Sequence, residues 1–258
     1  MFSSHNRRIR KLLPGFLIGI LPLTGRALDA GYPFFKNDVD EPLTLEVVFE
    51  RLDRNIVQEV AFSGSRFAGD QEEDRLAGRL YYYATPRVTL HLQLGSTDAE
   101  QSSSNAPLAG GGLSVRIWER GALRLSGFAS GTYVHEIEYR RPGVLTPLAE
   151  IAAVRRLESY AEYGGGARLS ADVFTRPGIR LAAYGGVTFS VMEAEGEEHF
   201  TFTTTGQSQS DHSVDFDEDG AGSLFAGLVL QRNANFGARL EGRFVDQSSY
   251  TAGIFFSF

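Results

Sequence analysis

The last nine residues, 250–258, alternate strictly between two kinds of side chain. One parity is apolar to the final residue and consists of Tyr250, Ala252, Ile254, Phe256 and Phe258. A period of two is the pattern of a pleated strand with two unlike faces. An apolar face that continues to the chain end suits a strand whose outer side contacts lipid. We therefore expect the chain to end in a membrane-facing β-strand.

The same alternation recurs from Pro42 onward and predicts ten strands. Their expected spans are 43–51, 75–84, 87–96, 111–118, 122–133, 157–173, 178–190, 222–231, 236–245 and 249–258. Short connections rich in Pro, Gly or Asn alternate with four connections of about 14 to 31 residues, and a tight turn at 246–248 joins the last pair. Eight strands, with 43–74 as an irregular arm, form the alternative count. A soluble antiparallel sandwich also alternates and is the competing fold.

In its terminal strand and its alternating connection lengths the chain resembles bacterial outer-membrane β-barrels, either small ones of the OmpA and OmpX type or a ten-stranded barrel. The resemblance implies an all-β fold, namely a closed antiparallel up-and-down transmembrane β-barrel. It also implies that the alternate apolar residues Tyr250, Ala252, Ile254, Phe256 and Phe258 form an assembly signal that the barrel-assembly machinery recognises. Outer-membrane lipid would then surround the protein. Short turns of such barrels face the periplasm, so both termini are expected there, in the outer membrane of a Gram-negative cell.

The first 27 residues predict a cleaved secretory signal peptide. Four basic residues between Arg7 and Lys11 precede the apolar run 12–23, and Gly25-Arg26-Ala27 offers a small-x-small cleavage site. The expected domains are therefore 1–27, removed on export, and 28–258, the barrel. Removal of five basic residues leaves 20 Lys and Arg against 32 Asp and Glu, a net charge of −12 that argues against nucleic acid as a partner. The chain has no cysteine, which excludes disulfides and thiolate metal sites.

If the polar alternate residues of each strand face the interior of the barrel, the lumen is charged. The expected lumen residues are Glu46, Glu50, Arg79, Arg116, Arg124, Glu158, Glu162, Arg168, Arg180, Arg239, Glu241 and Arg243. These side chains should meet across a narrow interior and form ion pairs, with Phe128, Tyr184 and Phe255 between them. The alternative is a narrow water-filled path, porin-like and anion-preferring, because seven cations meet five anions.

Aromatic residues near the predicted strand ends suggest girdles at the two membrane surfaces, although parity sends some of them into the lumen. The candidates are Tyr81, Tyr82, Tyr83, Trp118, Tyr133, Tyr139, Tyr160, Tyr163, Phe244 and Tyr250. Parity sends Tyr82 and Tyr250 outward and Tyr81 and Tyr83 inward. In the third long connection, Thr146-Pro147 and Arg155-Arg156 predict a short helix over 146–157.

The longest predicted loop, 191–221, carries a possible calcium site. Asp215, Asp217 and Asp219 alternate before Gly220, as at the start of an EF-hand loop, but Ala226 stands where the bidentate Glu belongs. A solvated acidic loop is the plainer interpretation. No other cofactor is indicated.

Two groups of His and carboxylate residues are candidates for activating water, namely Asp211 with His212, and His135 with Glu136 and Glu138. Outer-membrane proteases of the omptin family are ten-stranded and carry an Asp and His pair at the outer rim, but clear paired aspartates are missing here. We therefore expect a structural or surface-interaction barrel with an unknown surface partner. The narrow anion-preferring pore is the second expectation, and a hydrolase is the third.

Overall fold

The computed structural model describes residues 43–60, 65–99, 102, 105–142, 151–202, 208–218, 222–233, 235–245 and 247–258. Side chains are described for most of these. The strands are β1 (Leu43–Val60), β2 (Ser65–Thr85), β3 (Val88–Ala99), β4 (Ala106–Arg120), β5 (Leu123–Pro142), β6 (Ile151–Arg176), β7 (Ile179–Phe202), β8 (Ser208–Glu218), β9 (Ser223–Arg232), β10 (Phe236–Val245) and β11 (Gln247–Ser257). Within these ranges no helix is long and apolar enough to span a bilayer.

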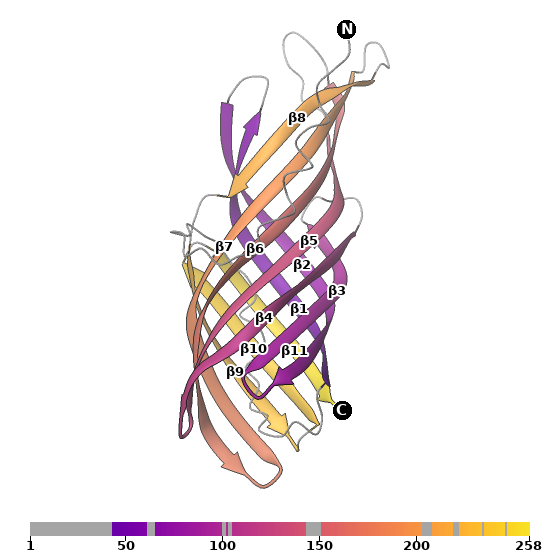
Figure 1. Ribbon diagram of the computed structural model, residues 1–258. Helices are drawn as coiled ribbons and strands as arrows, with labels where there is room; N and C mark the ends of the chain where they lie inside the picture. Colours follow the sequence, from indigo (N-terminus) through magenta and orange to yellow (C-terminus); the bar gives the residue numbers. More distant parts are fainter. Residues whose placement is uncertain are drawn as a thin grey trace.

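Ten of the strands close into one antiparallel barrel, shown in Figure 1. Each pairs with its neighbours in the order β11-β10-β9-β7-β6-β5-β4-β3-β2-β1, and β1 pairs back onto β11 from Thr44↔Ser257 to Arg54↔Gln247. The expected closed barrel of ten strands is thus confirmed, and the eight-stranded alternative is wrong. Closure leaves no free sheet edge at membrane depth, as a lipid environment requires.

The two faces of the barrel wall differ as the alternation predicts. On β3 the outward residues Leu90, Leu92 and Leu94 are 43–70% exposed, whereas the inward His91 and Gln93 are buried. The same belt of exposed apolar side chains continues on every barrel strand. A polar interior inside an apolar outer belt is the reverse of a water-soluble protein and excludes the soluble sandwich.

Five of the strands continue well beyond the belt. β6 has 26 residues, about 85 Å of extended chain, whereas about 9–11 residues suffice to cross a bilayer. The prediction of long loops at 52–74 and 191–221 is therefore wrong over much of their length, because β1, β2, β7 and β8 occupy those residues. Outward-facing residues are apolar only as far as the membrane surface. The apolar–polar alternation in the sequence therefore stops there, whereas the hydrogen-bonded pairing of the strands continues.

The helix predicted over 146–157 is wrong for residues 151–157, which belong to β6; residues 146–150 lie outside the described ranges. Ile151 pairs with Phe202 and Ala153 with Thr201, so the ladder with β7 satisfies the backbone groups that a helix would have used. Pairing with an already formed neighbouring strand outweighs the local capping signals.

β8 is an eleventh strand that lies outside the ten-stranded closure. It pairs with the far end of β7 over Thr201–Glu193 and with the far end of β1 over Ile56–Val60. Within the membrane belt, β9, β10 and β11 lie between β7 and β1. Above the belt, β8 alone lies between these two strands. Together with the extended ends of β1, β2, β5, β6 and β7 it forms what we call the distal wall, seen at the upper end of Figure 1.

A close approach between β10 and β11 shows how tightly the barrel interior is filled. Gly237 faces Phe255, which is fully buried, and a Cβ at position 237 would overlap the Phe255 ring. Gly78 on β2 is a contrasting case, because a Cβ there would meet nothing closer than the Leu94 carbonyl oxygen at 3.9 Å.

We expect Gly237→Ala to lower the free energy of unfolding by about 1–3 kcal/mol, since the added methyl overpacks a filled interior. Urea unfolding in detergent micelles measures this. The double variant Gly237→Ala/Phe255→Leu should recover part of the loss, and Gly78→Ala serves as the neutral control. Equal stabilities for Gly237→Ala and Gly78→Ala would contradict the packing described here.

Candidate functional site: the charged lumen

Arg239 on β10 is the centre of the inner charge network. Its side chain is fully buried, its Nε donates to Glu46 Oε1 at 3.0 Å, and its Nη1 lies 3.4 Å from Glu241 Oε2. Tyr81 donates its hydroxyl to Glu46 at 2.7 Å, and Tyr184 donates to Glu241 at 2.8 Å. The Arg239–Glu46 pair therefore ties β10 to β1 across the closing strand β11.

Arg243 extends this network toward the distal end. Its Nε and Nη2 both lie 3.1 Å from Glu241 Oε1, so Glu241 is shared between two guanidinium groups. Each guanidinium has a carboxylate partner, which is the condition under which buried charges are tolerated.

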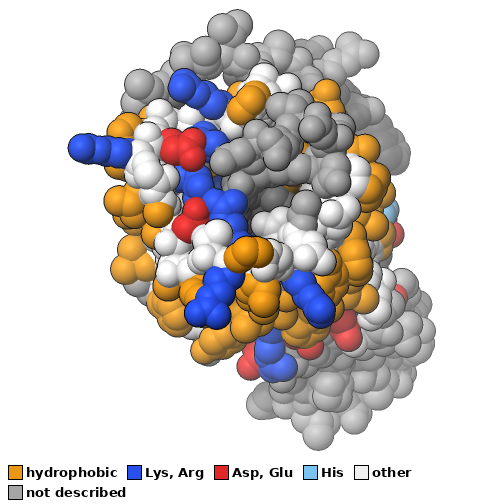
Figure 2. Space-filling view, turned by 90° about the horizontal axis from the view of Figure 1, so that it is seen from below, with side chains coloured by type: hydrophobic (Ala, Val, Ile, Leu, Met, Phe, Trp, Pro, Cys, Tyr) orange, Lys and Arg blue, Asp and Glu red, His pale blue; other side chains and the backbone are white. Residues whose placement is uncertain are grey.

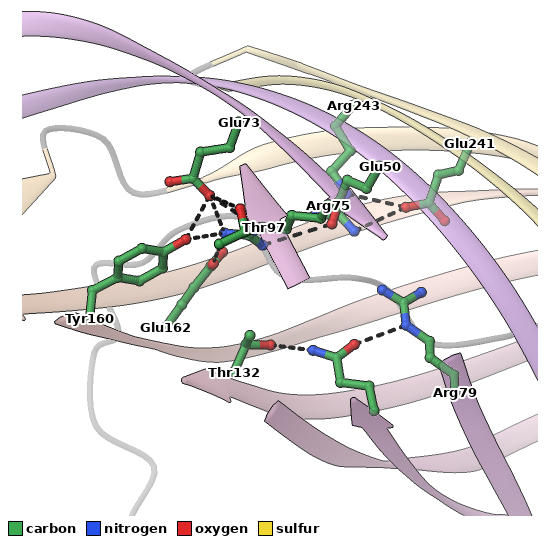
Figure 3. A network of polar contacts seen from close by, with 11 residues as sticks. Glu50, Glu73, Arg75, Arg79, Thr97, Thr132, Tyr160, Glu162, Glu241 and Arg243 are labelled. Atoms are coloured by element: carbon green, nitrogen blue, oxygen red, sulfur yellow. Dashed lines mark hydrogen bonds and ion pairs between the residues drawn. The ribbon is translucent and has the colours of Figure 1, made fainter. Parts of the chain in front are cut away.

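A second network surrounds Arg75 on β2 (Figure 3). Arg75 donates to Glu73 Oε2 and to Glu162 Oε2, both at 3.1 Å, and lies 3.8 Å from Glu50. Tyr160 donates to the same oxygen of Glu73 at 2.6 Å. Three carboxylates from β1, β2 and β6 thus converge on one cation, all of them buried.

Neutral amide and hydroxyl groups continue the network across β2, β3 and β5. Arg79 donates to Gln93 at 2.9 Å, and Gln93 in turn donates to Thr132 at 2.6 Å (Figure 3). Between these residues, Glu50 and Arg243, a cavity of about 20 Å³ remains. A space of this size holds about one water molecule.

A third group of charges lies at the mouth formed by the short turns. Arg124 binds Asp172 through both of its terminal nitrogens at 3.1–3.2 Å, and Arg180 binds the same carboxylate at 3.0 Å. Arg116 and Arg124 both donate to Glu119. Burial alone would raise the pKa of the Glu119 carboxyl, but the charge of Arg116 and these hydrogen bonds outweigh it and lower the pKa below its ordinary value.

The structure thereby divides the predicted lumen set into two parts. Arg116, Arg124 and Arg180 lie at the mouth, whereas the other members with described side chains lie deeper. The side chain of Glu158 lies outside the described ones. With Glu73 and Arg75 included, the deep lumen carries five arginines (75, 79, 168, 239 and 243) and five glutamates (46, 50, 73, 162 and 241) among the described side chains. The excess of cations expected from the sequence is absent there.

Sequence reasoning missed Glu73, which falls in the predicted connection 52–74, and Arg75, the first residue of the predicted strand 75–84. It also missed an apolar cluster on the inner wall toward the distal end, which includes Leu108, Val134, Ile137 and Met192, all buried. The alternation along β4, β5 and β7 could have indicated Leu108, Val134 and Met192, since each falls at the inward positions of its own strand. It could not have indicated Ile137, because a β-bulge between Val134 and Ile137 shifts the alternation on β5 by one residue.

The aromatic girdles are partly as predicted. Tyr82, Trp118, Tyr133, Tyr163, Phe244 and Tyr250 are exposed on the outer face. Tyr81 is buried and Tyr83 is partly buried, but Tyr160 is wrong as a girdle residue, because it shares the inward parity of Glu162 and points to Glu73. The side chain of Tyr139 lies outside the described ones.

The alternate apolar residues of the predicted C-terminal assembly signal lie on the lipid-facing side of β11. Tyr250, Ile254, Phe256 and Phe258 are 50–65% exposed, and Ala252 is exposed as well. Its recognition by the barrel-assembly machinery stays a prediction, which normal heat-modifiable folding without Phe258 would contradict.

The structure does not bring the two candidate catalytic groups together. His135 lies 3.7 Å from Glu136 and stacks on Tyr133, with both His135 and Glu136 exposed on β5. Asp211 and His212 lie on β8, where His212 pairs with Glu198 of β7. Three strand spacings, about 14 Å, separate β5 from β8.

The calcium prediction assumed a loop, but Asp215 and Asp217 lie within β8, and Asp219 lies outside the described residues. In a strand, alternate residues are arranged in a line and cannot wrap around an ion as an EF-hand loop does. Among the side chains that the structure describes, no three His, Asp or Glu are grouped to hold a metal.

A closed sheet, an apolar outer belt and a paired polar interior together decide the class of this protein. The chain is a transmembrane β-barrel of the outer-membrane type. No protein-family model and no curated protein sequence matches it.

Several solved structures of bacterial outer-membrane barrels resemble this barrel at low sequence identity. They include the translocator domain of the autotransporter NalP from Neisseria meningitidis (13% identity, 83% of this chain and 88% of that one, TM-score 0.43). Another is the outer-membrane protease OmpT from Escherichia coli, with 8% identity over 84% of this chain and 97% of that one and a TM-score of 0.48. A third is Ail, the attachment invasion locus protein of Yersinia pestis, with 10% identity over 83% of this chain and 99% of that one and a TM-score of 0.26. Their roles differ, and the fold assignment rests on the strand pairing of the chain itself.

We expect Arg239→Ala to destabilise the barrel by about 3–5 kcal/mol, because it leaves Glu46 buried without its main cationic partner. Urea unfolding in micelles checks this value. Arg51→Ala is the matched control, since Arg51 pairs with Glu72 on the exposed outer surface and should cost no more than about 1 kcal/mol. A stable Arg239→Ala variant would mean that water solvates Glu46.

Proposed function

We propose that this protein is a closed, non-conducting outer-membrane barrel that holds the distal wall at the cell surface for contact with a partner. The observation that carries the proposal is the charge-balanced interior, which holds five buried arginines and five buried glutamates, with Arg75, Arg79, Arg239 and Arg243 in ion pairs with glutamates. A conducting path would need these side chains to stand apart with water between them, and the cavity among them holds about one water molecule.

The distal end of the lumen supports the same proposal. Val134 and Ile137 are fully buried there, and Met192 and Leu108 are nearly so. These apolar side chains lie beside the ionic network, since Leu108 lines the same cavity as Arg75 and Glu162. They fill part of the interior and offer no polar partner to an ion that has left water.

The length of the strands supports a role beyond the membrane. β5, β6 and β7 have 20–26 residues each, whereas β9, β10 and β11 have 10 or 11. A barrel that only sealed or stabilised the membrane would need none of the extra residues. The paired distal wall presents a rigid surface, and rigid elements position binding residues better than free loops do.

The distal wall is strongly acidic by sequence. Apart from Glu73, which pairs with Arg75 in the lumen, residues 52–60, 65–74, 135–142, 151–159, 193–202 and 208–218 contain 16 Asp and Glu against 6 Arg, a net charge of −10. The register places Asp215 directly between Glu59 and Glu195 on the neighbouring strands. Like charges directly opposite each other destabilise a sheet, so a partner that brings positive charge would be favoured. We therefore propose a partner with a basic surface.

A narrow pore is the second candidate, and one observation favours it. Hydroxyl groups of Ser190, Ser223, Ser249 and Thr251 are buried on β7, β9 and β11 without a hydrogen-bond partner among the described residues. Buried hydroxyls of this kind are usually satisfied by water. A file of water along this side of the lumen would form a thin path.

Conductance of the purified protein in planar bilayers tests the proposal. A closed barrel gives no steady conductance, and Arg239→Gln, which removes a central charge, should still give none. Steady single-channel currents from the parent would overturn the proposal, and a chloride preference reduced by Arg239→Gln would establish the anion-preferring pore instead.

We also propose that the distal wall faces the outside and that the short turns and both termini face the periplasm. A protease site inserted after Gly206, between β7 and β8, should be cleaved on intact cells. The same site inserted at Asn233, between β9 and β10, should be cleaved only after the outer membrane is permeabilised. The reverse pattern would invert the barrel.

A further inference from the structure

Each of the four short turns carries one exposed arginine at the mouth opposite the distal wall. These are Arg87 after β2, Arg120 at the end of β4, Arg176 at the end of β6 and Arg232 at the end of β9. We call these four residues the arginine collar. Figure 2, which views the barrel from this end, shows basic side chains at several places around the mouth, with acidic groups among them and hydrophobic side chains on the surrounding surface.

The collar arginines differ from the arginines just inside the mouth. Arg116, Arg124 and Arg180 are held by Glu119 and Asp172, as described above. None of the four collar arginines has an ion pair with a carboxylate among the described residues, and the guanidinium of Arg176 instead lies over the Phe174 ring at 5.2 Å. Among the described side chains the mouth therefore combines seven arginines with two carboxylates, Glu119 and Asp172, and the four collar arginines are the ones that neither carboxylate binds.

The depth of the collar follows from its position next to the apolar belt. Tyr82, Trp118, Phe174 and Phe236 are 39–47% exposed on the outer face and lie within five residues of a collar arginine along the chain. Exposed aromatic rings mark the level where acyl chains give way to headgroups. The guanidinium groups, on flexible stems beyond these rings, reach the level of the lipid phosphates.

We propose that the arginine collar binds the phosphate groups of anionic phospholipids in the leaflet that meets the short turns. Arginine suits this ligand because its planar group donates two parallel hydrogen bonds to phosphate oxygens and keeps its charge at every physiological pH. The distal end, with its net charge of −10, repels the same lipids. The inference concerns the opposite end from the proposed partner surface and stands independently of it.

The protein contains its own reporter for this binding. Trp118 is the single tryptophan and lies two residues before Arg120, on the outer face at the level of the collar. Lipids that carry bromine on their acyl chains quench tryptophan fluorescence on contact. Quenching of Trp118 therefore measures which lipid occupies the leaflet at the short turns and ignores the other leaflet.

The test folds the protein into phosphatidylcholine vesicles that contain equal small fractions of either brominated phosphatidylglycerol or brominated phosphatidylcholine. We expect the anionic lipid to quench Trp118 with a relative affinity on the order of fivefold higher, and this preference should fall as salt rises. In the variant Arg87→Gln/Arg120→Gln/Arg176→Gln/Arg232→Gln the two lipids should quench equally. If that variant fails to show the heat-modifiable migration of a folded barrel, Arg120→Gln alone should still reduce the preference.

A matched control removes four arginines from the distal end, as Arg54→Gln/Arg66→Gln/Arg140→Gln/Arg141→Gln, and should keep the full preference. Equal quenching by both lipids in the parent would overturn the proposal. So would an unchanged preference in the collar variant. Equal quenching together with collar-dependent sedimentation of the detergent-solubilised protein with purified peptidoglycan would assign the arginines to that anionic polymer instead.

Discussion

Pairing of β1 with β11 is the interaction on which the rest of this structure depends. Inside a bilayer no water is present to satisfy a backbone amide or carbonyl, so a sheet is viable there only if its first and last strands meet. The register Thr44↔Ser257 to Arg54↔Gln247 provides this closure over eleven residue pairs. Once closed, the sheet turns one parity of every strand toward lipid and confines the other to a narrow interior. Both the apolar belt and the charged lumen are consequences of that single constraint.

The confined interior explains why the lumen is paired rather than merely polar. Long charged side chains from opposite walls reach one another, and a buried charge without a partner costs several kcal/mol. Arg239, Glu46 and Glu241 meet from β10 and β1, while Arg75 gathers carboxylates from β1, β2 and β6. These contacts tie distant strands together across the barrel. They also remove the space that conduction would need, which links the stability of the barrel to its proposed closed state.

Outside the membrane the constraints change, and the molecule changes with them. At one end the strands lengthen into an acidic wall, and β8 takes the place that three membrane strands occupy below it. At the other end the connections are short turns that each carry one exposed arginine. The barrel is therefore polarised in charge along its axis, with the apolar belt between the two ends. Such a molecule presents different chemistry to the two sides of the membrane.

The residues by themselves determined the barrel class, the number of closing strands and the inward or outward side of most positions, because these follow from a period of two and from the presence of lipid. Leu90, Leu92 and Leu94 face outward and Arg239, Glu241 and Arg243 inward for that reason alone. Only the tertiary structure decided where the strands end, because pairing above the membrane needs no apolar face, and the capping signals near 151–157 yield to a neighbouring strand. It also decided which charges meet. Glu73 and Arg75 join the lumen because β2 continues past the belt, and Arg116, Arg124 and Arg180 separate from it because their strands turn there. Which arginine pairs with which glutamate depends on distances across the barrel. The alternation of residues along a single strand contains no information about those distances.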